Sequence, residues 1–171
     1  MSDDDFLEAI RRSPHDTLVR LAYADWLEDQ RDPRARFLRV DTALVERCAD
    51  PKFSPEKNLD AGMEWDVVAH GIDRHWLAEA SIPCDLWLVK APLRAKRMLL
   101  GRVRNSLGVD LQRAREAMDT LPCRIVVAAP LGTAFQWLEN TGIRRKSPDA
   151  SRPRLSALSS MVVKYRITRS S

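Results

Sequence analysis

The sequence has few of the residues that build covalently linked or metal-bound sites. Of its 171 residues, three are cysteines and three are histidines. Cys48, Cys84 and Cys123 are far apart and form no Cys-x-x-Cys pair, which argues against a disulfide framework and against a zinc site. We predict that all three are buried thiols. No run of about 18 apolar residues occurs, and the N-terminus, MSDDDFLEAI, is acidic. We therefore expect no membrane span and no secretory signal, and a cytoplasmic protein.

The motifs of the common catalytic centres are also missing. The chain has no Gly-rich phosphate loop, no His-Glu-x-x-His and no Gly-x-Ser-x-Gly. Paired carboxylates in a polar framework are absent, and three histidines leave few ways to build a general base. His70 and His75 are five residues apart, the wrong spacing for two metal ligands on one helix face. We expect no enzyme activity, no cofactor, no metal and no small-molecule substrate.

Charge divides the chain into two halves. Residues 1–85 contain 19 acidic and 11 basic residues, a net charge of −8, whereas residues 86–171 contain 5 acidic and 17 basic residues, a net charge of +12. Such asymmetry predicts that the halves attract each other or that the basic half meets an acidic partner. Hydrophobic residues make up 44% of the chain, enough for one ordinary domain or two small ones.

The first half has helical periodicity. Residues 4–12 place carboxylates first and arginines last, the order that the helix dipole favours. Asp16 can cap a second helix that runs to about residue 30. Prolines predict a loop in residues 48–60, and residues 61–80 predict a third main helix. In the second helix we expect Leu18, Leu21, Ala22 and Leu27 to face inward and Val19, Tyr23 and Trp26 to lie on an adjoining apolar face, so that the helix contacts more than one neighbour. In the third helix the residues expected to face inward are Met63, Val67, Val68, Ile72, Trp76 and Leu77.

Asp25 stands next to Trp26 in the second helix and has two interpretations. A catalytic aspartate needs a base, a nucleophile or a metal as its partner, and nearby in the sequence there are only His15 and several arginines. The structural interpretation is better, because a carboxylate here can accept hydrogen bonds from the amides of the next helix or from Arg36.

The stretch DTLVRLAYADWLEDQRDPRARFLRV, residues 16–40, carries a Tyr-Ala-Asp-Trp-Leu-Glu motif followed by Asp-Pro. Together with FLEAI before it and AHGIDRHWL, residues 69–77, after it, this stretch resembles the repeat-companion domain found at the N-termini of many bacterial multidomain proteins. The resemblance implies a short helical module and no established activity.

The second half alternates strands and helices. Strands are predicted at residues 84–91 and 123–129, and 143–146 would be the third. Helices are predicted from Pro92 to Gly108, from Asp110 to just before Pro122, and over residues 131–142. We therefore predict an α+β fold, in which a small α-helical module precedes a compact βααβαβ unit with one three-stranded sheet and helices on one face. The predicted divisions are an acidic helical module (1–82), an α/β domain (83–146) and a basic tail (147–171), whose end, MVVKYRITRSS, predicts a strand that adds to the sheet edge or folds onto a partner.

The stretch VRNSLGVDLQRAREAMDTLP, residues 103–122, resembles the C-terminal domain of the ribosomal stalk protein L7/L12. The positions in register with that family are Val103, Arg104, Gly108, Leu111, Ala114, Arg115, Met118 and Pro122. The resemblance extends over residues 84 to about 146. It implies the fold and a docking surface on two helices, which in the family recruits translation GTPases through basic residues around an apolar centre.

The positions that match the docking surface of that family are Lys96, Leu100, Arg104 and Arg115. Gly101 stands where the family usually has a lysine, which weakens the implication of a GTPase partner. The family's N-terminal dimerisation helices and hinge are absent, so we expect that this chain is not itself a ribosomal stalk protein.

A helical wheel at 100° per residue supports an amphipathic helix. Leu99, Leu100, Val103 and Leu107 fall on one arc, Arg94, Arg97 and Arg104 fall on its flank, and Lys96 falls inside the apolar arc. An ordinary solvated helix face is the alternative. We expect a non-catalytic interaction or adaptor module that docks an acidic protein surface. The expected partner-binding residues are Lys96, Arg97, Leu100, Arg104 and Arg115.

Two other functions stay open. From Arg144 onward the chain has eight basic residues and one acidic residue, a density that suits sequence-independent binding of nucleic acid, such as RNA. Tyr165 is the only aromatic residue in that tail, so specific stacking on single strands is not expected. The related fold of the ClpS protease adaptors, which hold an N-terminal amine with acidic residues, is the other alternative. The basic half has five acidic residues in no evident cluster: Asp110, Glu116, Asp119, Glu139 and Asp149.

Overall fold

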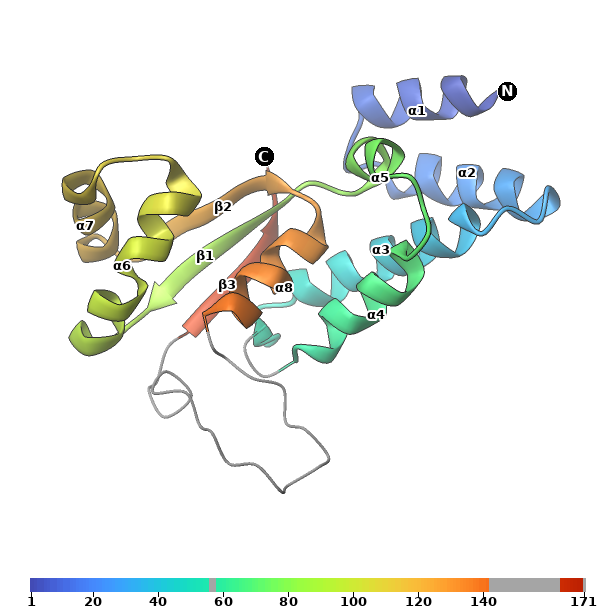
Figure 1. Ribbon diagram of the computed structural model, residues 1–171. Coiled ribbons are helices and arrows are strands. Elements are labelled where there is room, and N and C mark those ends of the chain that lie inside the picture. Colours follow the sequence, from blue (N-terminus) through green and yellow to red (C-terminus); the bar gives the residue numbers. More distant parts are fainter. Residues whose placement is uncertain (56–57, 142–163, 171) are drawn as a thin grey trace.

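The computed structural model describes residues 1–55, 58–141 and 164–170. These residues form an α+β fold in which helices come first and a three-stranded antiparallel sheet with further helices follows (Figure 1). The predicted α+β class is therefore confirmed. The helices before the sheet are α1 (Asp3–Arg12), α2 (Thr17–Asp29), α3 (Arg34–Ala49), α4 (Asp60–Ala69) and α5 (Arg74–Ala80).

Side-chain caps fix where the first two helices begin. The Ser2 hydroxyl accepts a hydrogen bond from the backbone N–H of Asp5 at 3.3 Å, and the Asp5 carboxylate accepts one from the N–H of Ser2 at 2.7 Å. This reciprocal pair satisfies two N–H groups that have no partner within the helix. Asp16 caps α2, as predicted, by accepting from the N–H of Leu18 at 2.9 Å.

The tyrosine of the Tyr-Ala-Asp-Trp motif connects four helices. Tyr23 is fully buried, and its ring stacks on Phe6 of α1 at 4.8 Å between centroids. Its hydroxyl donates to Asp3 and accepts from Trp76 Nε1 of α5 at 3.1 Å. Arg34 of α3 lies 5.2 Å from the Trp76 ring and forms an ion pair with Asp3 at 3.1 Å. The motif thus holds α1, α2, α3 and α5 together.

The inward face of α2 differs from the predicted one. Leu18 is 76% exposed, and Leu21 and Ala22 are also exposed. Of the four residues predicted to face inward, Leu27 does so; the other buried residues are Arg20, Tyr23 and Ala24. The rotation of α2 follows the hydrogen bonds of Arg20 and Tyr23 to other helices, because a buried polar group without a partner costs more than an exposed leucine.

The predicted helix over residues 61–80 is two helices. Gly71 adopts a φ of 81°, a left-handed conformation that favours glycine, and Asp73 caps α5 by accepting from the N–H groups of His75 and Trp76 at 3.0 Å each. The break changes which residues face inward. Val68 and Trp76 are buried as predicted, whereas Met63 and Val67 are 42% and 64% exposed.

The sheet has the strand order β2-β1-β3, and both pairs of neighbours are antiparallel. The strands are β1 (Cys84–Lys90), β2 (Cys123–Ala129) and β3 (Lys164–Arg169), and the helices between them are α6 (Leu93–Leu107), α7 (Leu111–Asp119) and α8 (Leu131–Asn140). The order β1, α6, α7, β2, α8, β3 is the predicted one. The third strand comes from the end of the tail; the strand predicted at residues 143–146 lies outside the described residues.

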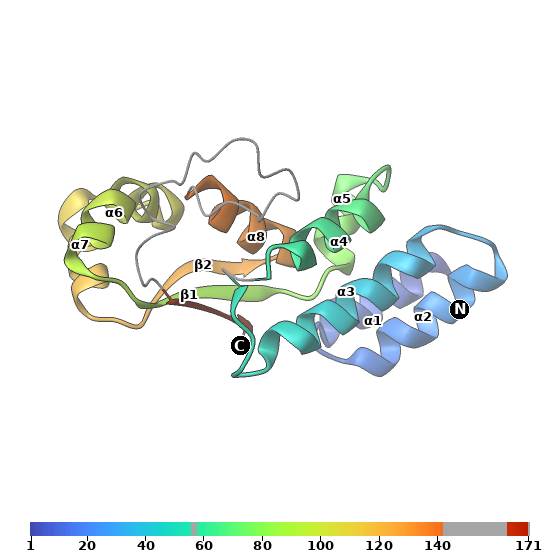
Figure 2. The same ribbon diagram turned by 90° about the horizontal axis from the view of Figure 1, so that it is seen from below.

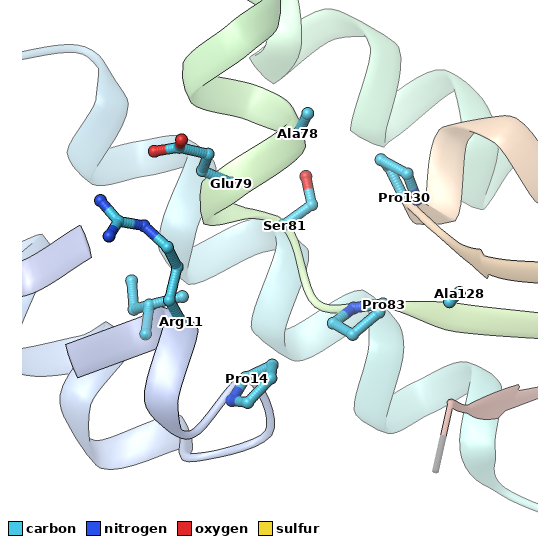
Figure 3. Close-up of a pocket in the computed structure, with 9 residues that line it drawn as sticks. Arg11, Pro14, Ala78, Glu79, Ser81, Pro83, Ala128 and Pro130 are labelled. Carbon is cyan, nitrogen blue, oxygen red and sulfur yellow. The ribbon is translucent and has the colours of Figure 1, made fainter. Parts of the chain in front are cut away.

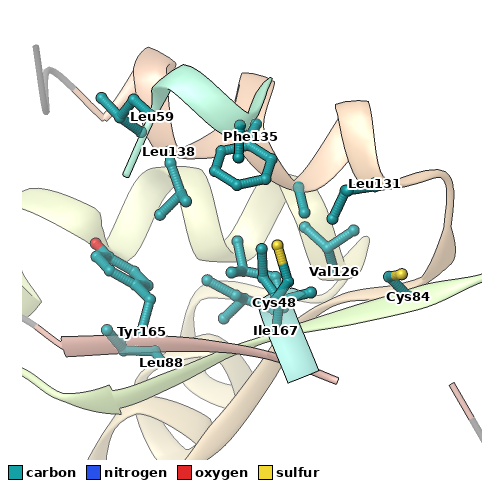
Figure 4. Close-up of a cluster of buried hydrophobic side chains, with 14 of the residues drawn as sticks. Cys48, Leu59, Cys84, Leu88, Val126, Leu131, Phe135, Leu138, Tyr165 and Ile167 are labelled. Carbon is teal, nitrogen blue, oxygen red and sulfur yellow. The ribbon is translucent and has the colours of Figure 1, made fainter. Parts of the chain in front are cut away.

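The helices α6 and α8 lie on the same side of the sheet (Figure 2). Leu86 and Leu88 of β1 face them and are fully buried. Figure 4 shows the side chains of α8 above those of the strands, with Cys48 of α3 between them. The labelled members of this core are Cys48, Leu59, Cys84, Leu88, Val126, Leu131, Phe135, Leu138, Tyr165 and Ile167.

This core also includes Leu44, Val45 and Cys48 of α3, so α3 and the sheet share one hydrophobic core, whereas the buried side chains of α1, α2 and α5 form a second cluster. Two buried polar side chains strengthen the junction. Arg20 of α2 donates to the carbonyl oxygens of Ala80 and Ser81, immediately before β1. Asp41 of α3 accepts from the N–H of Ile82 at 2.9 Å. These hydrogen bonds lie within the predicted module 1–82 and anchor its last residues just before β1; the contact with the sheet across the predicted boundary comes from Leu44, Val45 and Cys48.

Candidate functional site

The candidate site is built on α6, which follows Pro92 and ends at Gly108, where a φ of 63° reverses the chain. Ala95, Leu99 and Val103 are spaced by four residues and fully buried against the core. That spacing fixes the rotation of the helix, so its opposite side faces solvent. The helix α7 packs beside α6, with Ala114 and Met118 buried.

The five predicted partner-binding residues differ in their surroundings. Arg97, Arg104 and Arg115 are exposed. Lys96 is half-buried, and its Nζ lies 3.3 Å from Asp119 Oδ1 of α7, so the ammonium already has a partner. Leu100 is half-buried and packs against the main core. The structure thus places three of the five on the open surface, one in an ion pair and one beneath the surface.

Residues that sequence reasoning missed complete this surface. Met98 is 44% exposed and stands four residues from both Arg94 and Arg102, which are exposed as well. Residues four apart lie on the same side of a helix, so Met98 lies between two arginines. We define the α6–α7 surface as the exposed arginines and large apolar residues of the two helices: Leu93, Arg94, Arg97, Met98, Arg102, Arg104, Leu111, Arg113 and Arg115.

None of the six arginines of the α6–α7 surface forms an ion pair within the described part of the chain. Arg104 donates only to the side chain of Asn105, at 3.2 and 3.1 Å. The nearby acidic residues have other hydrogen-bond partners: Asp110 caps α7 through the N–H of Arg113, Glu116 accepts from Gln112, and Asp119 holds Lys96. The described residues therefore do not neutralise the positive charge of this surface. Asp149, the acidic residue in the predicted tail, lies outside the described residues.

Asp25 is exposed on α2, and its Oδ1 accepts from Arg39 Nη2 of α3 at 2.7 Å. The same guanidinium group also contacts Glu28. The prediction that Asp25 accepts from Arg36 or from a backbone amide is therefore wrong. Its partner is Arg39, three residues further along α3. This contact links α2 to α3, which agrees with the structural interpretation of Asp25.

The cysteines are buried, as predicted, and none is bonded to another. Burial raises the pKa of Cys48 to about 12 and also raises the pKa of Cys84 and of Cys123, so the thiols are protonated at neutral pH. Across the described ranges, no three His, Cys, Asp or Glu side chains are grouped as a metal site requires. His75 lies 3.6 Å from Glu79 of the same helix.

A shallow pocket of about 250 Å³ lies between α1, α5 and the start of β1. Figure 3 shows Arg11 and Glu79 at its rim and Pro14 and Pro83 on its walls. Ser81 also lines it, but the Ser81 hydroxyl donates to the carbonyl oxygen of Leu77 at 2.6 Å. The pocket therefore presents one cation, one anion and apolar walls, with no activated nucleophile.

Comparison of the chain with protein-family models, with curated proteins and with solved structures finds no match. The resemblances to the repeat-companion domain and to the stalk protein domain therefore stay predictions. Within residues 1–55, 58–141 and 164–170, no helix combines the length and the apolar character needed to cross a bilayer.

Proposed function

We propose that this chain is a non-catalytic protein interaction or adaptor module whose α6–α7 surface docks an acidic surface of a partner protein. One observation carries the proposal: six arginines are exposed on two adjacent helices, and none of them is engaged in an ion pair with the described residues. Exposed arginines around an apolar side chain are typical of protein interfaces, where arginine and methionine are enriched.

The exposed apolar side chain of α6 between Arg94 and Arg102 is Met98, whereas Leu100 lies on another side of the helix and packs against the main core. Methionine is unbranched and polarizable, so it adapts to partner surfaces of different shapes. Arg97 and Arg104 attract a carboxylate-rich partner over distances of about 10 Å in physiological salt. Lys96, which Asp119 holds, lies at the edge of the surface and contributes little net charge.

The acidic helices α1–α5 serve as a scaffold in this proposal. Their aromatic and polar contacts hold them together, and their shared core with the sheet fixes the position of α6. A docking surface on a rigid support loses little conformational entropy when it binds, which favours affinity.

The test is a titration of the isotope-labelled protein, followed by amide chemical shifts, with a synthetic helical peptide that carries leucine on one face and glutamate on the other. We expect the shifts to change mainly on α6 and α7, and the double variant Arg104→Glu/Arg115→Glu to lose this response while its thermal midpoint stays nearly unchanged. The affinity should also fall as salt rises.

The matched control is Arg36→Glu/Arg74→Glu, which changes the net charge by the same amount at two exposed residues of α3 and α5. We expect this control to bind the peptide almost as the unmodified protein does. Equal loss of binding in both double variants would mean that net charge alone attracts the peptide. A large loss of stability in Arg104→Glu/Arg115→Glu would show that these arginines are structural. Either result overturns the proposal.

A further inference from the structure

The two faces of the sheet differ in their surroundings. On one face Leu86 and Leu88 of β1, Ile167 and Tyr165 of β3, and Val126 of β2 are buried. The helices that contact the strands contribute residues to this same core. Because side chains alternate along a strand, Trp87 of β1 belongs to the opposite face. Trp87 is half-buried there, and Arg124 and Arg166 of the neighbouring strands are exposed.

The strand register places these three side chains in one row. Trp87 pairs with Arg124 of β2 on one side and with Arg166 of β3 on the other. Directly paired residues of antiparallel strands have Cβ atoms about 5 Å apart. The open face of the sheet therefore carries an arginine, a tryptophan and a second arginine across its three strands. The sequence separates Trp87 from Arg166 by almost half of the chain.

Neighbouring contacts fix the tryptophan ring in this row. The indole Nε1 donates to the Thr168 hydroxyl at 3.0 Å, and the Arg124 guanidinium carbon lies 5.8 Å from the ring centroid. Asp85, which is almost fully buried, accepts from Arg124 at 3.0 Å and from the N–H of Ala128 at 2.9 Å. Asp85 thus holds Arg124 over the Trp87 ring, and the two side chains are preorganised for binding.

Arg166 has a different environment from Arg124. It is exposed, and it forms no ion pair with any residue of the described ranges. Lys90, at the end of β1, is exposed too. The face consequently offers an aromatic ring beside a held guanidinium group, and one guanidinium group that is free to bind an anion.

We propose that this open face binds single-stranded nucleic acid, with Trp87 stacking on a base and Arg166 contacting a phosphate. Single-strand-binding surfaces combine aromatic side chains with cations that follow the phosphate backbone. An unpaired base presents the planar group that matches the ring, and its phosphate matches Arg166 in charge. Tyr165, the tail aromatic considered from the sequence, is buried with its ring against Trp137 and does not belong to this face. The site is separate from the α6–α7 surface.

The experiment is a filter-binding titration with a fluorescein-labelled oligouridine, repeated with an oligodeoxythymidine and with double-stranded RNA of the same length. We expect both single strands to bind more tightly than the duplex. Trp87→Leu should weaken binding roughly fivefold to a hundredfold, the range for loss of one stacked base. Trp87→Phe keeps an aromatic ring and should retain most of the affinity. The thermal midpoint of each variant shows whether it is folded.

Arg166→Glu tests the phosphate contact against the matched control Arg36→Glu, which makes the same charge change on α3. Loss of one phosphate contact should reduce the slope of log affinity against log salt by about 0.7 for a single strand. The control should leave the slope unchanged.

Four results would overturn this proposal: no retention of either single strand at low salt, equal affinity in folded Trp87→Leu, equal effects of Arg166→Glu and Arg36→Glu, or equally tight binding of a polyglutamate peptide to the variant Arg104→Glu/Arg115→Glu, in which the α6–α7 surface is removed as its site. The last result would identify the face as a site for acidic protein. Arg104→Glu/Arg115→Glu should affect oligouridine binding no more than Arg36→Glu/Arg74→Glu does, so this proposal and the proposed docking function fail independently.

Discussion

Replacing Arg20 with methionine tests how the acidic helices are joined to the sheet. The side chain is fully buried, and its guanidinium group donates to the carbonyl oxygens of Pro14, Ala80 and Ser81. Burial lowers the pKa of Arg20 to about 10, so the group remains charged at neutral pH. Methionine keeps an unbranched apolar stem of similar length and removes only the cation and its donors.

The expected loss follows from the groups left without a partner. The buried carbonyl oxygens of Ala80 and Ser81 and the partly buried one of Pro14 lose their donor, and each buried unsatisfied group costs about 1–3 kcal/mol. The buried carboxylate of Asp41 loses the favourable field of the cation as well. Removal of the desolvation cost of the guanidinium group offsets part of this loss. We expect the free energy of unfolding to fall by about 3–5 kcal/mol, which is the sum of these costs less that offset.

Urea denaturation followed by circular dichroism measures this loss. With a slope of about 2 kcal/mol per molar urea, the midpoint of Arg20→Met should fall by about 1.5–2.5 M. Arg36→Met, at an exposed residue of α3, is the control and should change the free energy of unfolding by less than about 0.5 kcal/mol. A loss below about 1 kcal/mol in Arg20→Met would refute the assigned role of this network.

Two further predictions concern packing and pH. Gly62→Ala should lower the free energy of unfolding by about 1–3 kcal/mol, because the added Cβ would lie 2.6 Å from Phe135 Cβ. Gly101→Ala, whose added Cβ would have nothing within 4 Å, should raise the free energy of unfolding by about 0.5–1 kcal/mol. Urea titrations in which both variants change the stability in the same direction would contradict this prediction. Burial favours a higher pKa for Asp85, but hydrogen bonds from Ala128 and Arg124 outweigh it and lower the pKa below 3.8. The carboxylate therefore stabilises the fold above about pH 4, and this contribution is lost as the pH falls. The stability difference between the unmodified protein and Asp85→Asn should be larger at neutral pH than near pH 3, and a constant difference in urea titrations at both pH values would contradict the assignment.

Local signals in the sequence were sufficient for most of the fold. Asp16, Pro92 and Gly108 mark ends of helices, and the order of strands and helices in the second half follows from periodicity. The rotation of α2 was not predictable in this way. Arg20 and Tyr23 are polar residues that face inward because their partners, Ala80 and Trp76, come from more than fifty residues away.

The candidate site shows the same limit. The wheel of α6 placed Leu99, Leu100, Val103 and Leu107 on one apolar arc, and the structure confirms that this side faces the core, but the wheel did not single out Met98, which is exposed. The buried spacing of four residues was visible in the sequence and could have fixed the rotation. The row around Trp87 was not visible, because it depends on the register between strands that are distant in the sequence.

The charge division of the chain does not hold its two halves together. In the described ranges two ion pairs join residues 1–85 to residues 86–171: Arg124 with Asp85 at 3.0 Å, and Arg169 with Glu46 at 3.5 Å. Asp85 lies in β1, so its pair with Arg124 of β2 joins two strands of the sheet and not the acidic helices to the sheet. The exposed Arg169–Glu46 pair contributes at most about 1 kcal/mol. The halves are held together instead by the hydrophobic core that α3 shares with the sheet, while the buried hydrogen bonds of Arg20 and Asp41 anchor the residues just before β1.

The charge is distributed unequally between the two ends of the molecule. The helices α6 and α7 lie at the opposite end of the molecule from α1 and α2 (Figures 1 and 2). If the α6–α7 surface docks an acidic partner, as we propose, that partner is attracted to the end that carries α6 and α7 and repelled by the acidic residues of the N-terminal helices. In that case the acidic module orients an approaching partner as well as supporting the fold. Neutralising acidic residues on α1 should hardly change the dissociation rate of an acidic partner docked on α6 and α7, because α1 does not contact it. The same change should increase unproductive encounters at the end of the molecule that carries α1 and α2.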